Sequence, residues 1–222
     1  MNNKNWKFAA LLSLAAFGFA GHASAEVINN TVITESFDPF GAPDTATYGQ
    51  TITVGSDNLL NGFSLFLYGR EDGDPLNFRG YVGTWDGTKA TDILYTSAVQ
   101  TMGTDGAFME FAFDTGALNL TTGSKYVLFI SISDLGPQPP SGFAMPGTGN
   151  TYAGGDFVFH NSGIDFASLT RDPWDCAECF KSDAAFTAQL SGDAPGQVPE
   201  PAPLALLGLG VLALAAARRK QA

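Results

Sequence analysis

The chain has 222 residues, and its 22 Asp and Glu outnumber its 11 Lys and Arg, which gives a formal net charge of −11. Such an acidic chain is repelled by phosphate backbones and anionic lipid headgroups, so we expect no nucleic-acid partner. Charged residues make up 15% of the chain, whereas Gly (26) and Phe (18) are abundant. This composition favours strands and turns and argues against a helical bundle.

The amino-terminal segment, residues 1–25, predicts a secretory signal peptide of the Sec pathway. A polar stretch with two lysines precedes a largely apolar run from Phe8 to Ala20. Small residues, Ala23 and Ala25, stand at positions −3 and −1 of a cut after Ala25. The alternative, a buried amino-terminal helix, does not explain the basic flank and the A-x-A end. We therefore expect the mature chain to begin at Glu26.

Export determines how the two cysteines, Cys176 and Cys179, are interpreted. They form a local C-A-E-C motif, and such a pair is expected to oxidise outside the cytosol. A thioredoxin-like redox motif would stand at the start of a helix in an α/β unit, and a zinc site would need further ligands of this kind. We expect a structural disulfide that closes a small loop.

The carboxyl-terminal segment, residues 199–222, combines three features in a fixed order. Pro199-Glu200-Pro201 precedes an apolar run over residues 204–217, and Arg218, Arg219 and Lys220 follow. As a helix the apolar run would measure about 21 Å, which is short of the ~30 Å hydrocarbon layer. The cations suit the cytoplasmic side and act as a membrane stop. The pattern predicts a single hydrophobic helix that anchors the chain temporarily.

These three features resemble the PEP-CTERM sorting signal of Gram-negative bacteria. The resemblance implies that an exosortase-like enzyme of the inner membrane recognises Pro199-Glu200-Pro201 and processes the tail during export. The prolines keep the segment extended, so Glu200 is presented just outside the bilayer. The alternative is a linker before an ordinary tail anchor. The resemblance implies transient inner-membrane anchoring, followed by release to the cell surface or the extracellular space.

The body, residues 26–190, predicts a β domain that a linker over 191–198 joins to the tail. Residues 46–54 and 107–114 alternate between apolar and polar side chains, which predicts strands with one solvent-exposed face. Residues 59–68 and 126–132 are apolar on both faces, as in the central strands of a sandwich. Further strands are expected over residues 27–37, 77–85, 91–99, 156–160 and 184–190.

This pattern of about nine strands predicts a jelly-roll-like antiparallel β-sandwich, because no stretch of the body sustains a helical period with caps. The longest loops, residues 70–75, 85–88, 134–150 and 163–180, are expected to carry any binding surface. Trp85, Trp174 and Tyr152 lie in or near these loops and are candidates for stacking on sugar rings. The alternative is that these rings belong to the core or its rim.

Catalytic patterns are weak in the body. His160 is the one histidine after the signal peptide, and no G-x-S-x-G motif accompanies it, which argues against a Ser-His-Asp hydrolase. Abundant Asp and Glu would supply the carboxylate pair of a glycosidase. The Asp72-Gly73-Asp74 and Asp86-Gly87 pairs are candidate calcium ligands, but such pairs are also ordinary turn formers. We expect no cofactor and no resident metal. The alternative is a bound calcium ion.

Together these features predict a non-enzymatic exported protein of the cell surface or the extracellular matrix. In this interpretation the β-sandwich takes part in an exopolysaccharide or biofilm matrix or binds polysaccharide. The alternative is a secreted glycan-active hydrolase that uses two of its carboxylates.

Overall fold

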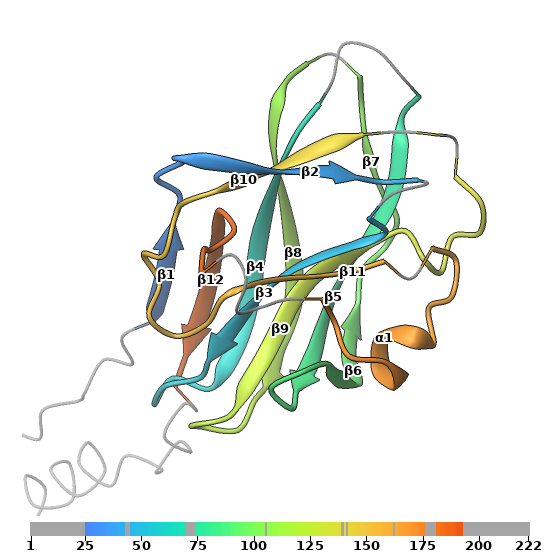
Figure 1. Cartoon of the computed structure of the whole chain (residues 1–222). Helices are drawn as coiled ribbons and strands as arrows, with labels where there is room; N and C mark the ends of the chain where they lie inside the picture. The colour runs from blue at the N-terminus through green and yellow to red at the C-terminus, as the bar shows by residue number, and fades with distance from the viewer. Residues whose placement is uncertain are drawn as a thin grey trace, which may run out of the picture.

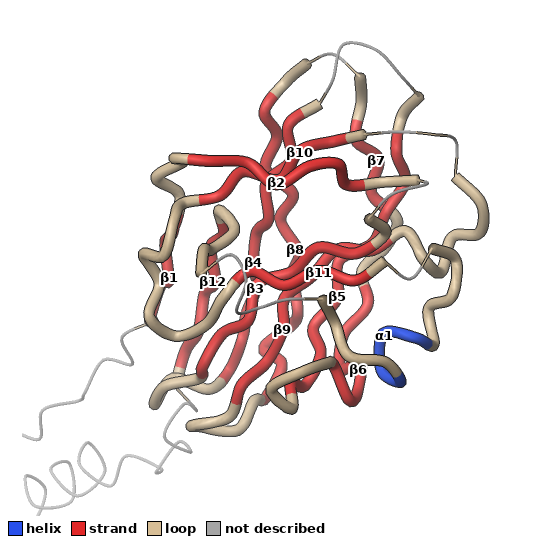
Figure 2. Tube along the Cα trace, viewed as in Figure 1, coloured by secondary structure: helices blue, strands red, loops and turns tan. Residues whose placement is uncertain are grey.

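The computed structural model shows a β-sandwich of two antiparallel sheets (Figures 1 and 2). The structure describes residues 25–42, 45–69, 74–104, 106–138, 140, 142–161, 163–175 and 181–192. Within these ranges the single helix, α1 (Ser168–Arg171), is only one turn long. The β-sandwich fold predicted from the sequence is confirmed. No helix in the described part of the chain is long and apolar enough to cross a membrane.

The first sheet has six strands in the order β1-β12-β4-β10-β2, with β8 on the other edge of β4. Its strands are β1 (Glu26–Asn30), β2 (Glu35–Phe40), β4 (Leu59–Tyr68), β8 (Phe108–Asn119), β10 (Phe143–Gly147) and β12 (Phe186–Ser191). β12 pairs with β4 from Leu59 to Leu65, whereas β10 meets β4 only at Tyr68. β4 is therefore the central strand of this sheet, and β8 forms one of its edges.

The second sheet also has six strands, in the order β11-β3-β9-β5-β6, with β7 beside the beginning of β5. Its strands are β3 (Thr47–Thr53), β5 (Leu76–Trp85), β6 (Ala90–Thr96), β7 (Gln100–Met102), β9 (Lys125–Ser131) and β11 (Phe157–His160). β9 lies at the centre, between β3 and β5.

The strand count differs from the sequence prediction in three places. Residues 27–37 contain two strands, β1 and β2, and β7 follows the strand expected over 91–99. β10 lies inside the segment 134–150, for which a loop is expected. Its sequence FAMPG contains Pro and Gly, which are rare inside strands, so the pattern gives no strand signal there.

The main core lies between the sheets and is built from side chains that alternate inward. It includes Leu65, Phe111 and Phe186 from the first sheet and Ile52, Val82 and Leu128 from the second. Burying one such side chain contributes roughly 1.5–3 kcal/mol relative to leaving it in water. This core explains why both sheets require one apolar face.

A second, smaller core covers the outer face of the second sheet. Val127 and Phe129 of β9 point away from the main core, and both are fully buried. Leu169 of α1 and Trp174 pack over them, from the segment that follows β11. The apolar character of residues 126–132 on both faces therefore reflects two separate cores.

The structure also corrects one expectation about β3. The alternation over residues 46–54 predicts that Thr47, Thr51 and Thr53 face solvent, but Thr47 and Thr51 are buried. Thr51 Oγ1 donates to the carbonyl of Asp156, and the Thr47 hydroxyl lies 2.7 Å from that of Ser131. These residues belong to the outer side of the covered sheet, where hydroxyls bond to neighbouring segments.

The two ends of the described chain lie together at one end of the first sheet. β1 and β12 are antiparallel neighbours, with Glu26 opposite Leu190, and Ser191 is paired with Leu59 at the beginning of β4. Tyr68 ends β4 nine residues after Leu59, which places it about 30 Å from Leu59. The predicted domain boundary at 190 falls one residue before the end of β12. The chain thus enters and leaves the sandwich opposite the end where β2 and β10 lie (Figure 1).

Candidate functional site

The outer face of the first sheet contains a shallow groove over β12, β4 and β8. The groove has a volume of about 420 Å³. Its lining residues are Asn61, Gly62, Phe63, Ser64, Ala112, Phe113, Asp114 and Gln189. Gly62, Ser64 and Ala112 are small and form the floor, whereas Asn61, Asp114 and Gln189 supply amide and carboxylate groups. The groove therefore has a shallow floor of small side chains and hydrogen-bonding groups at its rim.

Two exposed aromatic rings lie at the far end of the same strands. Tyr68 and Phe108 are directly opposite each other in the β4–β8 register, and they are 49% and 47% exposed. Phe66 lies beneath Phe108 in a stacked arrangement, with ring centroids 5.3 Å apart and planes inclined by 13°. We call Tyr68, Phe108 and the supporting Phe66 the aromatic platform.

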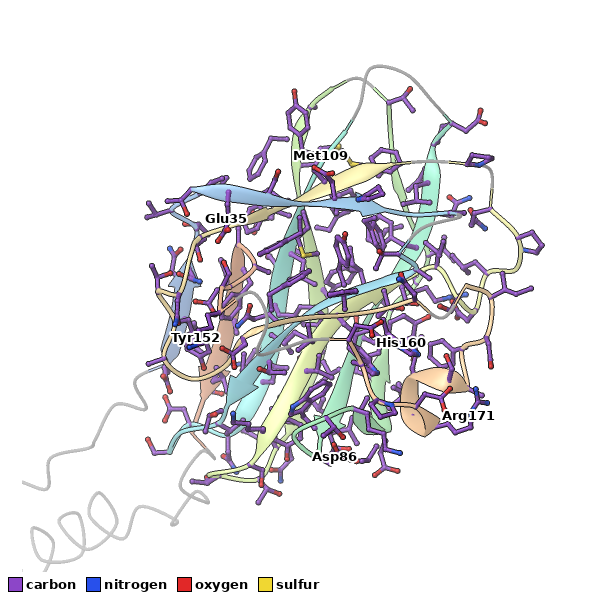
Figure 3. The ribbon with its side chains drawn as sticks, viewed as in Figure 1. Glu35, Asp86, Met109, Tyr152, His160 and Arg171 are labelled. Carbon is purple, nitrogen blue, oxygen red and sulfur yellow. The ribbon has the colours of Figure 1, made fainter. Side chains whose placement is uncertain are left out.

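A second groove, also about 420 Å³, adjoins the aromatic platform. It is lined by Ile33, Glu35, Ser36, Tyr68, Phe108, Ala144 and Pro146. Glu35 Oε1 accepts hydrogen bonds from the Gly149 N–H and the Ser182 hydroxyl, which fixes this carboxylate at the rim. Figure 3 shows Glu35 and Met109 at the end of the sandwich away from Asp86.

Alternation along β4 and β8 joins the groove and the platform into one face. Every second residue points outward, and the register pairs Gly62 with Asp114, Ser64 with Ala112, Phe66 with Glu110 and Tyr68 with Phe108. The six-residue distance from Gly62 to Tyr68 corresponds to about 20 Å. A ligand that used the whole face would be an extended chain.

Another aromatic-lined pocket, of about 240 Å³, lies between β2 and the β3–β11 pair. Phe37 and Phe157 stack there with ring centroids 3.8 Å apart, and Tyr48 packs edge-on against Phe157. These three rings are buried and belong to the main core. The pocket therefore exposes ring edges, and it offers less aromatic surface than the platform.

Trp174, one of the predicted sugar-stacking residues, is a core residue. Its indole is 6% exposed, and its N–H donates to the Leu169 carbonyl at 2.7 Å. His160 stacks on it, and Trp85 and Phe129 pack edge-on against it. A ring covered in this way has no open face for a sugar, so the structure gives Trp174 a packing role.

The other two predicted stacking residues are half-buried. Trp85 lies at the end of β5 beside Trp174, on the covered sheet. Tyr152 packs edge-on against Phe186 of the first sheet, and its main-chain N–H donates to Asp183. Trp85 and Tyr152 thus pack against different sheets, and their role in sugar binding stays a prediction.

His160 is buried beside Ser168, a neighbour that the sequence did not suggest. Their Nε2 and Oγ atoms are 3.1 Å apart, and the Ser168 hydroxyl donates to the Asp165 carbonyl at 2.7 Å. The serine oxygen therefore accepts from a protonated Nε2, the reverse of the proton transfer that a nucleophilic serine needs. Burial lowers the pKa of His160, which keeps the ring neutral. This geometry is structural.

The structure describes only some of the candidate calcium ligands. Asp86 Oδ1 accepts hydrogen bonds from the Thr88 N–H, the Thr88 hydroxyl and the Lys89 N–H. These bonds, led by that from the Thr88 N–H, lower the pKa of Asp86. Asp86 thus closes a turn, whereas Asp72 lies outside the described residues. Among residues that are described, no three His, Cys, Asp or Glu side chains form a cluster suited to a metal.

A buried carboxylate, Asp183, is the main polar feature that sequence reasoning missed. Its oxygens accept hydrogen bonds from the Gln50 side chain at 3.0 Å and from the main-chain N–H groups of Thr151 and Tyr152 at 2.8 and 2.7 Å. Burial raises the pKa of Asp183, although these donors oppose the shift. The network ties β3 to the loop that precedes β11, which is a structural role.

Several predicted residues lie outside those that the structure describes. They are Ala23 of the cleavage site, Cys176 and Cys179, the sorting triplet Pro199-Glu200-Pro201 and the cations Arg218, Arg219 and Lys220. The disulfide and the cleavage site stay predictions. Ala25 is described, and β1 begins directly after it at Glu26.

Comparison with known families gives one match. The family model of the PEP-CTERM protein-sorting motif matches residues 197–220, which include the sorting triplet and the terminal cations. The comparisons with curated proteins and with solved structures give no match. The PEP-CTERM resemblance seen in the sequence is confirmed for this segment.

The fold and the sorting motif together define the class of the protein. It is an exported β-sandwich protein that carries a PEP-CTERM signal at its carboxyl end. The motif implies transient membrane anchoring and processing by an exosortase, which is a membrane enzyme.

Proposed function

We propose that this protein is a non-enzymatic component of the cell surface or the extracellular matrix of a Gram-negative bacterium, and that it binds polysaccharide. The observation that carries the proposal is the aromatic platform of Tyr68 and Phe108 at the end of an open groove. Export through Sec and processing by exosortase would bring this face to the exopolysaccharide of a biofilm.

The chemistry of the face suits sugar rings. Aromatic rings combine a large apolar face with electron-rich character, and they stack on the C–H faces of sugars while the hydroxyls stay hydrated. The side chains of Asn61, Asp114 and Gln189 offer donors and acceptors to those hydroxyls. An open groove of about 20 Å along β4 accommodates a polymer better than a single sugar.

The position of the face relative to the tail also supports the proposal. The described chain leaves β12 beside Leu59, and Tyr68 lies at the opposite end of β4. While the tail holds the protein at the membrane, the aromatic platform would therefore point away from the bilayer. After processing the same face would remain open.

The alternative, a glycan-active hydrolase, requires two carboxylates at a suitable separation. The carboxylates on the outer face of β8 are Glu110 and Asp114, which are four residues apart on one strand. Their Cα atoms are thus about 13 Å apart. Side chains that project in parallel from these two positions keep their carboxylates at a similar separation, beyond the about 5 to 9.5 Å of glycosidase carboxylate pairs, so this spacing favours binding over hydrolysis.

Binding can be tested with the mature protein collected from producing cells. Depletion from solution by insoluble polysaccharides gives the affinity of the parent, of Tyr68→Ala and of Phe108→Ala. We expect each substitution to weaken binding about tenfold, which corresponds to the loss of one stacking ring. Leu94→Ala, which truncates an exposed side chain on the second sheet, is the matched control. Equal binding by all four proteins would refute the proposed face.

Sorting is tested separately by Glu200→Ala. We expect this variant to be translocated and folded but to stay uncut in the inner membrane, because residues 204–217 and the terminal cations still anchor it. Replacing Arg218, Arg219 and Lys220 with Gln should instead weaken retention. Mass spectrometry of the released parent protein should find a carboxyl end near Pro199 to Pro201. An intact Ala222 on released protein would contradict processing.

A further inference from the structure

We propose that the polysaccharide bound by the outer face of the first sheet carries amino groups, so that the polymer is cationic. This inference rests on the proposed function and specifies its ligand. It is drawn from the distribution of charge between the two sheets.

The strands of the first sheet contain acids but no cations. Their sequences carry Glu26, Glu35, Asp38, Glu110 and Asp114 and not one Lys or Arg. Among residues that the structure describes, the cations are Arg79, Lys89, Lys125, Arg171 and Lys181, all outside these strands. The strands of the first sheet therefore carry negative charge and no positive charge.

Two of these acids lie on the outer face of β8, and Glu35 lines the adjoining groove, where Gly149 and Ser182 donate to it. Glu110 is opposite Phe66, next to the aromatic platform, and Asp114 is opposite Gly62 in the groove. Both residues are exposed. The ion pairs found in the described ranges join Arg79 to Asp134 and Arg171 to Asp165 and Asp172. Glu110 and Asp114 thus lie outside every one of those pairs and present negative charge to a ligand.

Carboxylates beside exposed rings form a suitable surface for ammonium groups. An ammonium is attracted both by the carboxylate and by the electron-rich face of an aromatic ring. A polymer of uronates or sulfated sugars would be repelled by the same surface. Charge complementarity therefore selects an amino-sugar polymer over an anionic one.

The test compares three soluble oligosaccharides of equal length with the mature exported protein. They are a glucosamine oligomer, its fully N-acetylated counterpart and an oligouronate, at a pH that keeps the amines protonated. We expect the glucosamine oligomer to bind about tenfold more tightly than the N-acetylated one and to lose that advantage as salt rises from about 0.05 to about 0.5 M. Tightest binding of the oligouronate would overturn the inference.

Matched variants identify the groups responsible. Glu110→Gln and Asp114→Asn together should lower the affinity for the glucosamine oligomer about tenfold, to that of the N-acetylated oligomer. Binding of the N-acetylated oligomer should weaken far less, because Gln and Asn keep an acceptor oxygen. Asp92→Asn, an exposed acid of the second sheet, should change neither affinity. If the parent binds both oligomers equally, the inference fails and the proposed function stands. If it binds no saccharide, the proposed function itself fails.

A second inference comes from an independent observation at the beginning of β1. The main-chain nitrogen of Glu26 lies 3.0 Å from Asp57 Oδ2. Glu26 is also the first residue after the predicted cleavage site. Hydrolysis of the Ala25–Glu26 bond gives the hydroxyl of water to the Ala25 carbonyl and a hydrogen to the Glu26 nitrogen, which then takes a further proton. We infer that Asp57 receives this new α-ammonium and holds the edge strand β1 in place.

The reactivity of the α-amine tests this inference on the mature exported protein. A carboxylate partner stabilises the ammonium, so Asp57→Asn should increase labelling of the Glu26 amine by an amine-selective reagent several-fold at neutral pH. Asp92→Asn is the control and should leave the labelling unchanged. Unchanged labelling in Asp57→Asn, or a mature chain that begins at another residue, would overturn the inference.

Discussion

The outer faces of the two sheets differ in what covers them. On the second sheet, Val127 and Phe129 are buried beneath Leu169 and Trp174 of the segment after β11. On the first sheet, Tyr68 and Phe108 occupy the corresponding outward positions and stay about half exposed. One outer face of the sandwich thus adds to stability, and the other leaves aromatic surface open to a ligand.

The difference follows from the sequences of the strands. Residues 126–132 are apolar on both faces, so leaving either face in water would expose a contiguous apolar patch. On the outer face of β8, Glu110 and Asp114 interrupt the apolar residues, and the floor of the groove is made of small side chains. Such a face can stay in water without a cover, and its two exposed rings are the candidate ligand-binding feature.

The largest expected effect comes from removing the cover of the second sheet. Trp174→Ala should lower the free energy of unfolding by about 3–5 kcal/mol, because it leaves a cavity over Phe129 and His160. Chemical denaturation of the mature protein measures this loss. Trp85→Ala is the control and should cost less, since Trp85 is only half-buried. If Trp85→Ala were the more damaging change, the assigned role of the cover would be wrong.

Filling the groove of the first sheet should have the next largest effect. Ala112→Trp places a large ring on the groove floor between Asp114 and the aromatic platform. We expect polysaccharide affinity to fall about tenfold, which is about 1.4 kcal/mol, with little change in the free energy of unfolding. Unaltered affinity in a folded Ala112→Trp protein would place the ligand elsewhere.

The covered face should also make stability depend on pH through His160. Burial lowers the pKa of the folded His160, with Asp175, Asp172 and Asp165 raising it and Arg171 lowering it further. Below about pH 6.5 the unfolded chain takes up a proton that the folded chain resists, so stability falls as pH decreases. From pH 7.5 to 5.5 we expect a loss of up to about 1.4 kcal/mol in the free energy of unfolding.

His160→Gln is the matched variant for this measurement, because its side chain is polar and does not titrate in that range. Its unfolding free energy should change less between the two pH values than that of the parent. An equal pH dependence in both proteins would show that other groups cause it.

The smallest effect is expected at the Asp86 turn. Asp86→Ala removes three hydrogen bonds from an exposed turn, so the free energy of unfolding should fall by less than about 1 kcal/mol. Asp86→Asn retains an acceptor oxygen and should be closer to the parent. Figure 3 shows Asp86 at the other end of the molecule from Met109, which is next to Phe108 of the platform in β8. Neither change should therefore alter polysaccharide affinity. A stabilising effect of calcium that disappears in Asp86→Ala would instead indicate a metal site.

The sequence predicted the sandwich because strand periodicity is local, as in the alternation of Phe111 and Phe113 with Glu110 and Asp114. The platform could not be predicted in the same way, because it depends on the register that places Phe108 opposite Tyr68. The outward Phe108 and Glu110 in an alternating strand were the available signal. Likewise, the cover containing Trp174 has no periodicity, and the Gln50–Asp183 hydrogen bond joins residues 133 positions apart.

Hydroxyl-radical footprinting of the mature exported protein, with and without polysaccharide, tests the central claim most directly. Tyr68 and Phe108 are exposed on the platform and should react in the free protein. We predict that the bound glucosamine oligomer protects Tyr68 and Phe108, while Trp85 and Leu94 of the second sheet keep their reactivity. Protection of Trp85 and Leu94 with no change at Tyr68 and Phe108 would contradict the assignment of the open face as the binding site.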